Sequence, residues 1–122
     1  MSLLLNGLFA LELALLLTHE MDAVGQKEWK LFIFLKDLPQ QTAYWVFTLP
    51  HIVLYALVLF FLLLKSTIIL YVVDLFLICH LLLHYFFRKH PENHLTGFWS
   101  KLIINFAGII AGIHLILMMI AH

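Results

Sequence analysis

Four long apolar stretches, separated by short polar segments, constrain this chain more than any other feature of its sequence. A helix needs about 20 mostly apolar residues to cross the hydrocarbon core of a bilayer. Hydrophobic residues make up 64% of the chain and charged residues only 11%, whereas a soluble domain averages about 25% charged residues. We therefore predict an all-α fold, an integral membrane four-helix bundle, as a single domain over residues 1–122. The predicted spans are about 2–18, 43–64, 67–87 and 98–120.

The connection between the first two spans is the longest, at about residues 20–41. Between Trp29 and Lys36 it mixes aromatic residues with lysines, a composition typical of a helix that lies among lipid headgroups. We expect a short interfacial helix there; the alternative is that the first helix continues beyond the membrane. Pro50 lacks the N–H that would bond to Val46, so it predicts a kink in the second span.

The basic residues predict how the chain is oriented. Lys65 is alone on one side of the predicted topology. The loops on the other side, which we take as cytoplasmic, contain Lys27, Lys30, Lys36, Arg88, Lys89 and Lys101. We expect a bacterial inner-membrane protein with both termini on the non-cytoplasmic side. The formal net charge is zero, so no basic face is available to bind nucleic acid.

The polar residues of the spans gather toward the cytoplasmic half of the membrane. Ionisable groups in a bilayer cost about 2.5–3.5 kcal/mol each even on the gentlest scale, so they normally face a bundle interior. Helix geometry places one group of residues at a common depth, Glu12, His51, His80 and Asn105. A second group lies near the cytoplasmic boundary or just outside it: His19, Glu20, Asp22, His84, His90 and His94.

This convergence predicts a metal site, because imidazole with carboxylate suits zinc or non-haem iron. His80 and His84 are one helical turn apart and can chelate one ion. The remaining candidate ligands are His19 and His51 together with Glu12, Glu20 and Asp22. An ion at this depth can lower the pKa of bound water or activate oxygen, which predicts a metal-dependent enzyme that modifies membrane lipids.

Two other functions fit the same residues. His51 and His80 come from different helices at equal depth and can be the axial ligands of a b-type haem in an electron-transfer protein. The polar residues can also form a core without any cofactor, in a non-catalytic membrane subunit. In that case the Gly108/Gly112 face, which permits close approach of helices, would bind a partner or a second copy of the chain.

Two polar residues are expected to lie outside the main cluster. Asp74 is in the outer half of the third span, and we expect its carboxyl group to bond with Tyr55 at nearly the same depth. His114 lies near the outer boundary, almost opposite Asn105 on its helix, so we exclude it from the site.

The segment His19-Glu20-Met21-Asp22-Ala23, followed by Glu28-Trp29 and three more apolar helices, resembles an uncharacterised family of short bacterial four-helix membrane proteins with an HExDA-type N-terminal motif. This resemblance implies no particular activity. The spacings His80/His84 and His90/His94 are similar to one kind of box in the histidine-box membrane hydroxylases. Those enzymes also use His-His doublets around two irons, and this sequence has none, which argues against a di-iron oxygenase.

Overall fold

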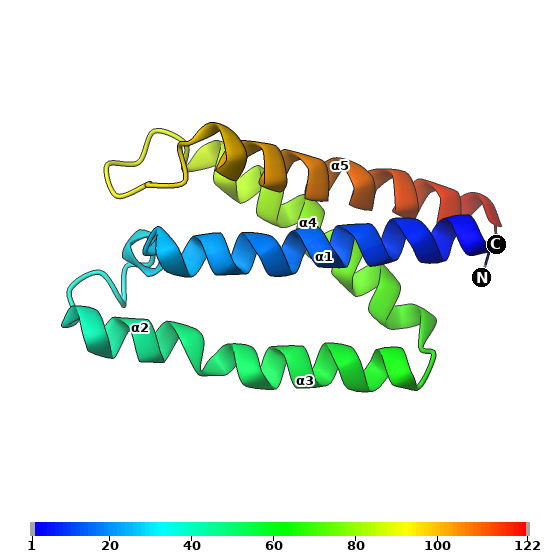
Figure 1. Ribbon diagram of the computed structural model, residues 1–122, viewed down its shortest axis with the longest axis horizontal. Coiled ribbons are helices and arrows are strands. Elements are labelled where there is room, and N and C mark those ends of the chain that lie inside the picture. Colours follow the sequence, from blue (N-terminus) through cyan, green and yellow to red (C-terminus); the bar gives the residue numbers. More distant parts are fainter. Residues whose placement is uncertain (1, 122) are drawn as a thin grey trace.

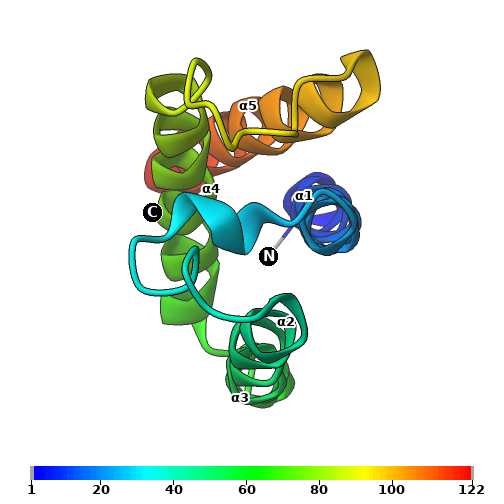
Figure 2. The same ribbon diagram turned by 90° about the vertical axis from the view of Figure 1, so that its left-hand side faces the viewer.

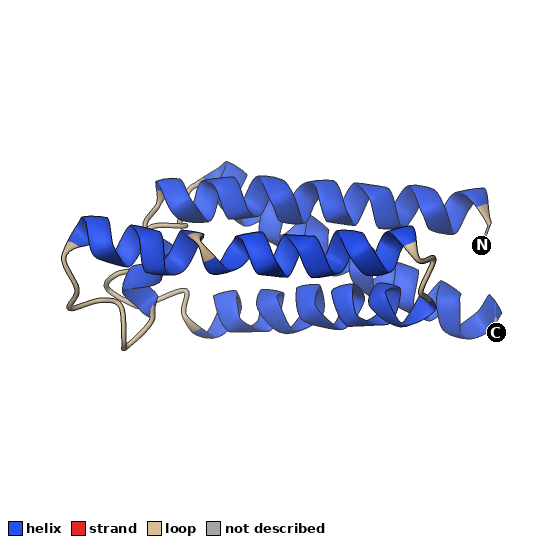
Figure 3. Ribbon diagram, turned by 90° about the horizontal axis from the view of Figure 1, so that it is seen from below, coloured by secondary structure: helices blue, strands red, loops and turns tan. Residues whose placement is uncertain are grey.

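The computed structural model describes residues 2–121 as a set of helices joined by short loops (Figure 1). No strand occurs in this range, so the predicted all-α class is confirmed (Figure 3). The elements are α1 (Leu3–Gly25), the 3-10 helix η1 (Glu28–Leu31), α2 (Gln40–Thr48), α3 (Pro50–Leu63), α4 (Thr67–Phe86) and α5 (Phe98–Ala121).

Four helical segments are long and apolar enough to cross a membrane: Leu3–Gly25, Gln40–Leu63, Thr67–Phe86 and Phe98–Ala121. Many large apolar side chains on their outer surfaces are exposed, as expected where the solvent is lipid. The arrangement is consistent with a four-helix bundle in an integral membrane protein. Both termini lie at the same end, opposite η1 and the loop between α4 and α5 (Figure 1).

The segment predicted as the first connection contains the end of one helix and the whole of a short one. Helix α1 continues to Gly25, seven residues beyond the predicted end of the span. The segment also contains the short 3-10 helix η1, which covers only Glu28–Leu31, and the chain then runs through turns up to α2. Because α1 extends to Gly25, His19 lies within the helix and not beyond its end.

The predicted break in the second span is confirmed. Leu49 separates α2 from α3, and Pro50 is the first residue of α3. Because proline has no N–H, it cannot donate the helical hydrogen bond across this point. The adjacent His51 is fixed by a hydrogen bond from its Nδ1 to the Phe47 carbonyl oxygen, at 2.7 Å.

The core lies between α1, α4 and α5, while α2 and α3 lie to one side (Figure 2). Buried apolar residues from these three helices include Phe9, Leu16, Val73, Leu77 and Ala111, whereas no residue of α3 is buried. Helices α4 and α5 pack closely at Gly108. A Cβ atom added there would lie 2.5 Å from Leu81 Cδ2, so only glycine fits.

Candidate metal centre

The turn that follows α1 directs Glu28 back toward this helix. Lys27 adopts a left-handed conformation (φ 55°, ψ 49°), which ends the helix and reverses the chain direction. The next residue, Glu28, begins η1 and is buried together with Trp29. The Trp29 ring packs against Tyr44 and Phe47 of α2, which holds η1 across this end of the bundle.

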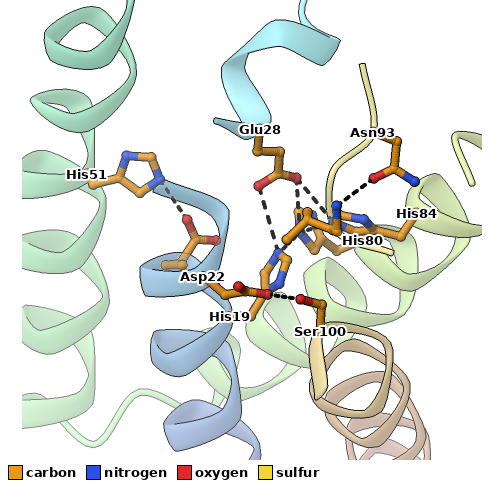
Figure 4. Close-up of polar contacts among 10 residues, drawn as sticks. His19, Asp22, Glu28, His51, His80, His84, Asn93 and Ser100 are labelled. Atoms are coloured by element: carbon orange, nitrogen blue, oxygen red, sulfur yellow. Dashed lines mark hydrogen bonds and ion pairs between the residues drawn. The ribbon is translucent and has the colours of Figure 1, made fainter. Parts of the chain in front are cut away.

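Three histidines meet beneath Glu28 (Figure 4). His80 Nε2 lies 2.8 Å from His19 Nε2 and 3.1 Å from His84 Nε2. His19 comes from α1, and the other two come from successive turns of α4. Neutral imidazole nitrogens at such distances need a shared proton or a cation between them, because two lone pairs repel each other.

The Glu28 carboxylate closes this group. Its Oε1 is 3.1 Å from His84 Nε2 and 3.9 Å from His80 Nε2, and its Oε2 is 3.9 Å from His19 Nε2. Burial raises the pKa of Glu28, but the hydrogen bond from His84 and the nearby imidazoles outweigh it and hold the pKa below its usual value. Glu28 is therefore a carboxylate at neutral pH. We call His19, Glu28, His80 and His84 the His–Glu cluster.

The His–Glu cluster has the donor set and spacing of a metal site. One ligand atom from each of the four residues can be chosen so that all lie within 4.8 Å of one another. Tetrahedral zinc with bonds of about 2.0–2.1 Å separates its ligand atoms by about 3.3 Å, close to the nitrogen–nitrogen distances here. His19 Nδ1 is buried without a hydrogen-bond partner in the described part of the chain.

Three other predicted ligands lie outside the His–Glu cluster in two separate contacts. His51 Nε2 pairs with Glu20 Oε2 at 3.0 Å. The Asp22 carboxylate accepts a hydrogen bond from the Ser100 hydroxyl, which ties α1 to the start of α5 (Figure 4). Both contacts involve residues near the end of α1, and none of the three predicted ligands belongs to the group of four.

The structure places Glu12 in a different group. Glu12 lies near Asp74 of α4 and His114 of α5, and all three are fully buried. The expected bond between Asp74 and Tyr55 is wrong, since the Asp74 carboxylate is paired with His114. His114 lies outside the His–Glu cluster, but it is 3.9 Å from Glu12, which the sequence placed in the predicted metal site. It lies on the buried face of α5, and Asn105, almost opposite on the helix, is exposed.

Sequence reasoning missed Glu28 as a candidate ligand. It lies beyond the predicted end of the first span, in a segment that the sequence predicts to be a connection. The available signal was its place nine residues after His19, within the Glu28-Trp29 pair that follows the HExDA segment. The reversal at Lys27, where glycine would be usual, could not be predicted from the sequence.

The histidines named for a haem are both engaged elsewhere. His51 is held by Phe47 and Glu20, and His80 by His19 and His84. A haem between these two rings would require both sets of contacts to break. The contacts therefore favour a non-haem ion over a porphyrin.

A cavity of about 620 Å³ adjoins His84 on the side of α4 that faces α5. Leu81, Leu82 and Ile104 form an apolar part of its lining. The polar part includes three cations, Arg88, Lys89 and Lys101, and two amides, Asn93 and Asn105. The lining thus combines apolar surface with positive charge beside one residue of the His–Glu cluster.

Residues 5–121 match the model of DUF6713, a family of unknown function, and the chain belongs to this family. This agrees with the resemblance noted in the sequence. No curated protein and no solved structure matches the chain.

Proposed function

We propose that the protein is a membrane metalloenzyme that holds zinc or non-haem iron in the His–Glu cluster and modifies anionic lipids. The observation that carries this proposal is the convergence of three Nε2 atoms and a buried carboxylate, drawn from α1, η1 and α4. His19, His80 and His84 are the proposed ligands. Glu28 is the proposed base, because it stays ionised and its oxygens face all three imidazoles.

The cavity beside His84 supports a lipid as the substrate. Arg88, Lys89 and Lys101 attract a negatively charged headgroup, and the leucine side chains favour the adjoining acyl chain. Arg88 is already positioned, because its guanidinium donates to the Tyr85 carbonyl oxygen at 2.9 Å and lies over the Tyr85 ring. By the orientation predicted from the basic residues, this end of the bundle faces the cytoplasm.

A bound ion of this kind supplies Lewis acidity and a water molecule of lowered pKa. The protein groups have separate tasks around it. Glu28 accepts the proton of the attacking water, and the cationic rim orients the headgroup so that the bond to be broken lies near His84. Burial of Glu28 and His19 limits the access of other water molecules to the reacting atoms.

The test uses the full chain, purified without a polyhistidine tag and reconstituted into vesicles. One set of vesicles contains phosphatidylglycerol and the other only phosphatidylcholine. Mass spectrometry of the lipids, in the presence of oxygen, reports both hydrolysis and oxidation. We expect a product from the anionic lipid that disappears with a chelator and returns with zinc or iron.

Two variants separate the assigned roles. Glu28→Gln should keep the metal content but reduce turnover by about 100-fold or more, the usual contribution of a general base. The matched control is Glu92→Gln, which changes a partly exposed carboxylate at the same end of the molecule and should leave turnover unchanged. A chain that carries no metal, or the same product from the protein and from a chelated sample, would overturn the proposal.

A further inference from the structure

A second polar group lies farther along the bundle, where α1 and α4 pack against α5. It consists of Glu12 from α1, Asp74 from α4 and His114 from α5, and each has 0% of its surface exposed. His114 Nδ1 is 2.9 Å from Asp74 Oδ2 and 3.9 Å from Glu12 Oε1. Glu12 precedes His19 by seven residues, which places this buried triad about 10 Å farther along the bundle than the His–Glu cluster.

The triad contains polar atoms that the described chain leaves without partners. Neither oxygen of the Glu12 carboxyl group makes a hydrogen bond, and His114 Nε2 also has none. Buried polar groups in proteins are almost always paired, and a buried carboxylate without a partner is especially costly. Glu12 is therefore a fully buried group that faces the Asp74 carboxyl group, and two carboxyl groups so close need a proton or a cation between them.

The charges of the triad define that ligand. The titratable groups that face Glu12 are Asp74 and His114, so the triad presents two carboxyl groups and one imidazole. In a low-dielectric interior a net charge on the triad and its ligand would be strongly destabilising, so their total charge should be close to zero. Two protons achieve this, one on Glu12 and one on His114 beside an ionised Asp74. A divalent cation achieves it equally well, with both carboxylates ionised and the imidazole neutral.

Apolar layers surround the triad on both sides. Phe9, Leu70 and Met118 lie one helical turn away toward the chain termini, and all three are buried. They also line a cavity of about 810 Å³ that opens at that end, with Ser2, Asn6 and Thr67 among its polar lining residues. The Phe9 ring packs against His114 itself, with ring centroids 5.5 Å apart. The cavity therefore ends one layer from the triad.

From these observations we propose that Glu12, Asp74 and His114 form a second site, which binds a divalent transition-metal ion in exchange for two protons. Oxygen ligands dominate this site, whereas nitrogen ligands dominate the His–Glu cluster, so it accepts harder ions such as Mn²⁺ as well as zinc. The proposal does not depend on the enzymatic role given to the His–Glu cluster, because the two groups share no residue.

The experiment removes the His–Glu cluster first. In the full chain carrying His80→Ala and His84→Ala, Mn²⁺ binding is measured by the loss of the free-ion electron paramagnetic resonance signal, and Zn²⁺ binding by elemental analysis after desalting. We expect one ion of either metal per chain in this background. Addition of Glu12→Gln or Asp74→Asn should weaken binding by about 10-fold or more. Glu92→Gln in the same background is the matched control and should change nothing.

If the triad has only a structural role, the results should differ. If Glu12 only stabilises the fold, Glu12→Gln should lower the melting temperature of the metal-free protein. We expect little change, since the glutamine has the size and charge of the protonated Glu12 that the metal-free triad contains. The proposal is overturned if the background chain binds neither ion, or if the carboxyl variants bind as well as their parent. Failure of the His–Glu cluster is recognised separately, as wild-type protein that binds no more ions than the His80/His84 variant.

Discussion

The His–Glu cluster and the buried triad both lie between α1 and α4, but η1 completes the cluster and α5 completes the triad. The His–Glu cluster lies at the end of the bundle, is closed by η1, and has His84 beside a cavity with a cationic rim. The buried triad lies between apolar layers, and none of its side chains is exposed. Access to a cavity is therefore what distinguishes the group that we propose to be catalytic from the group that we propose to hold only an ion.

The two groups also differ in what holds their side chains. In the His–Glu cluster each of the four residues contacts another at 3.1 Å or less. In the buried triad Asp74 and His114 pair closely, while Glu12 has no hydrogen-bond partner in the described chain. The cluster should keep its shape without an ion, whereas the triad should change most when an ion or a proton binds.

The largest effect is expected from a variant that removes ligands of the His–Glu cluster and leaves the buried triad unchanged. The double change His80→Ala and His84→Ala removes two of the three imidazoles, so zinc affinity at the His–Glu cluster should fall by more than about 100-fold. Competition with a chromophoric chelator measures this affinity. His94→Ala is the matched control, because His94 is an exposed histidine in the neighbouring loop. Equal affinities of the double variant and wild type would show that the ligands were misassigned.

A smaller effect is expected from a change in the packing of α4, the helix that contributes residues to both the His–Glu cluster and the buried triad. Gly108→Ala would place a Cβ atom 2.5–2.8 Å from Leu81 side-chain atoms, so α4 and α5 must move apart. We expect a loss of about 1–3 kcal/mol in the free energy of unfolding, as for other overpacked sites. Unfolding in mixed detergent micelles measures it. At Gly112 an added Cβ meets nothing within 4 Å, so Gly112→Ala should be nearly neutral, and equal effects at the two glycines would contradict the packing.

The smallest effect is expected at the His–Glu cluster alone. Ser100→Ala removes the hydrogen bond that ties Asp22 to α5. Asp22 lies one turn beyond His19, so we expect zinc affinity at the cluster to fall by a few-fold, for a cost of about 1 kcal/mol. Mn²⁺ binding to the buried triad should stay unchanged. A similar loss at both groups would mean that Ser100 supports the bundle in general.

The apolar stretches predicted the helical class, the four spans and the break at Pro50, because hydropathy and proline chemistry are local properties. The grouping of polar residues was harder to predict. The predicted depths of the polar residues depend on a first span that ends at residue 18, but α1 continues to Gly25. Glu12 thus lies deeper than expected, beside Asp74 and His114, and not at the depth of His80.

The buried face of α5 also escaped prediction. Asn105 was chosen to face the bundle because it is polar and shares a face with Gly108. The structure buries Gly108 through its contact with Leu81 but leaves Asn105 exposed at the cavity beside His84. Which face of an apolar helix is buried depends on its neighbours, and here apolar residues occur on every side of α5. Glu28 was missed for a similar reason, since its place depends on the chain reversal at Lys27.

X-ray absorption at the metal edge of the purified, zinc-loaded chain tests the central claim most directly. The account predicts nitrogen and oxygen ligands at about 2.0–2.1 Å, with the outer-shell scattering of about two imidazoles per zinc when both sites are filled, because the His–Glu cluster supplies three and the buried triad one. In the His80/His84 double variant the imidazole scattering should fall to the level of the single histidine of the buried triad. A wild-type spectrum without imidazole scattering, or one that the double variant reproduces, would contradict a metal centre at His19, His80 and His84.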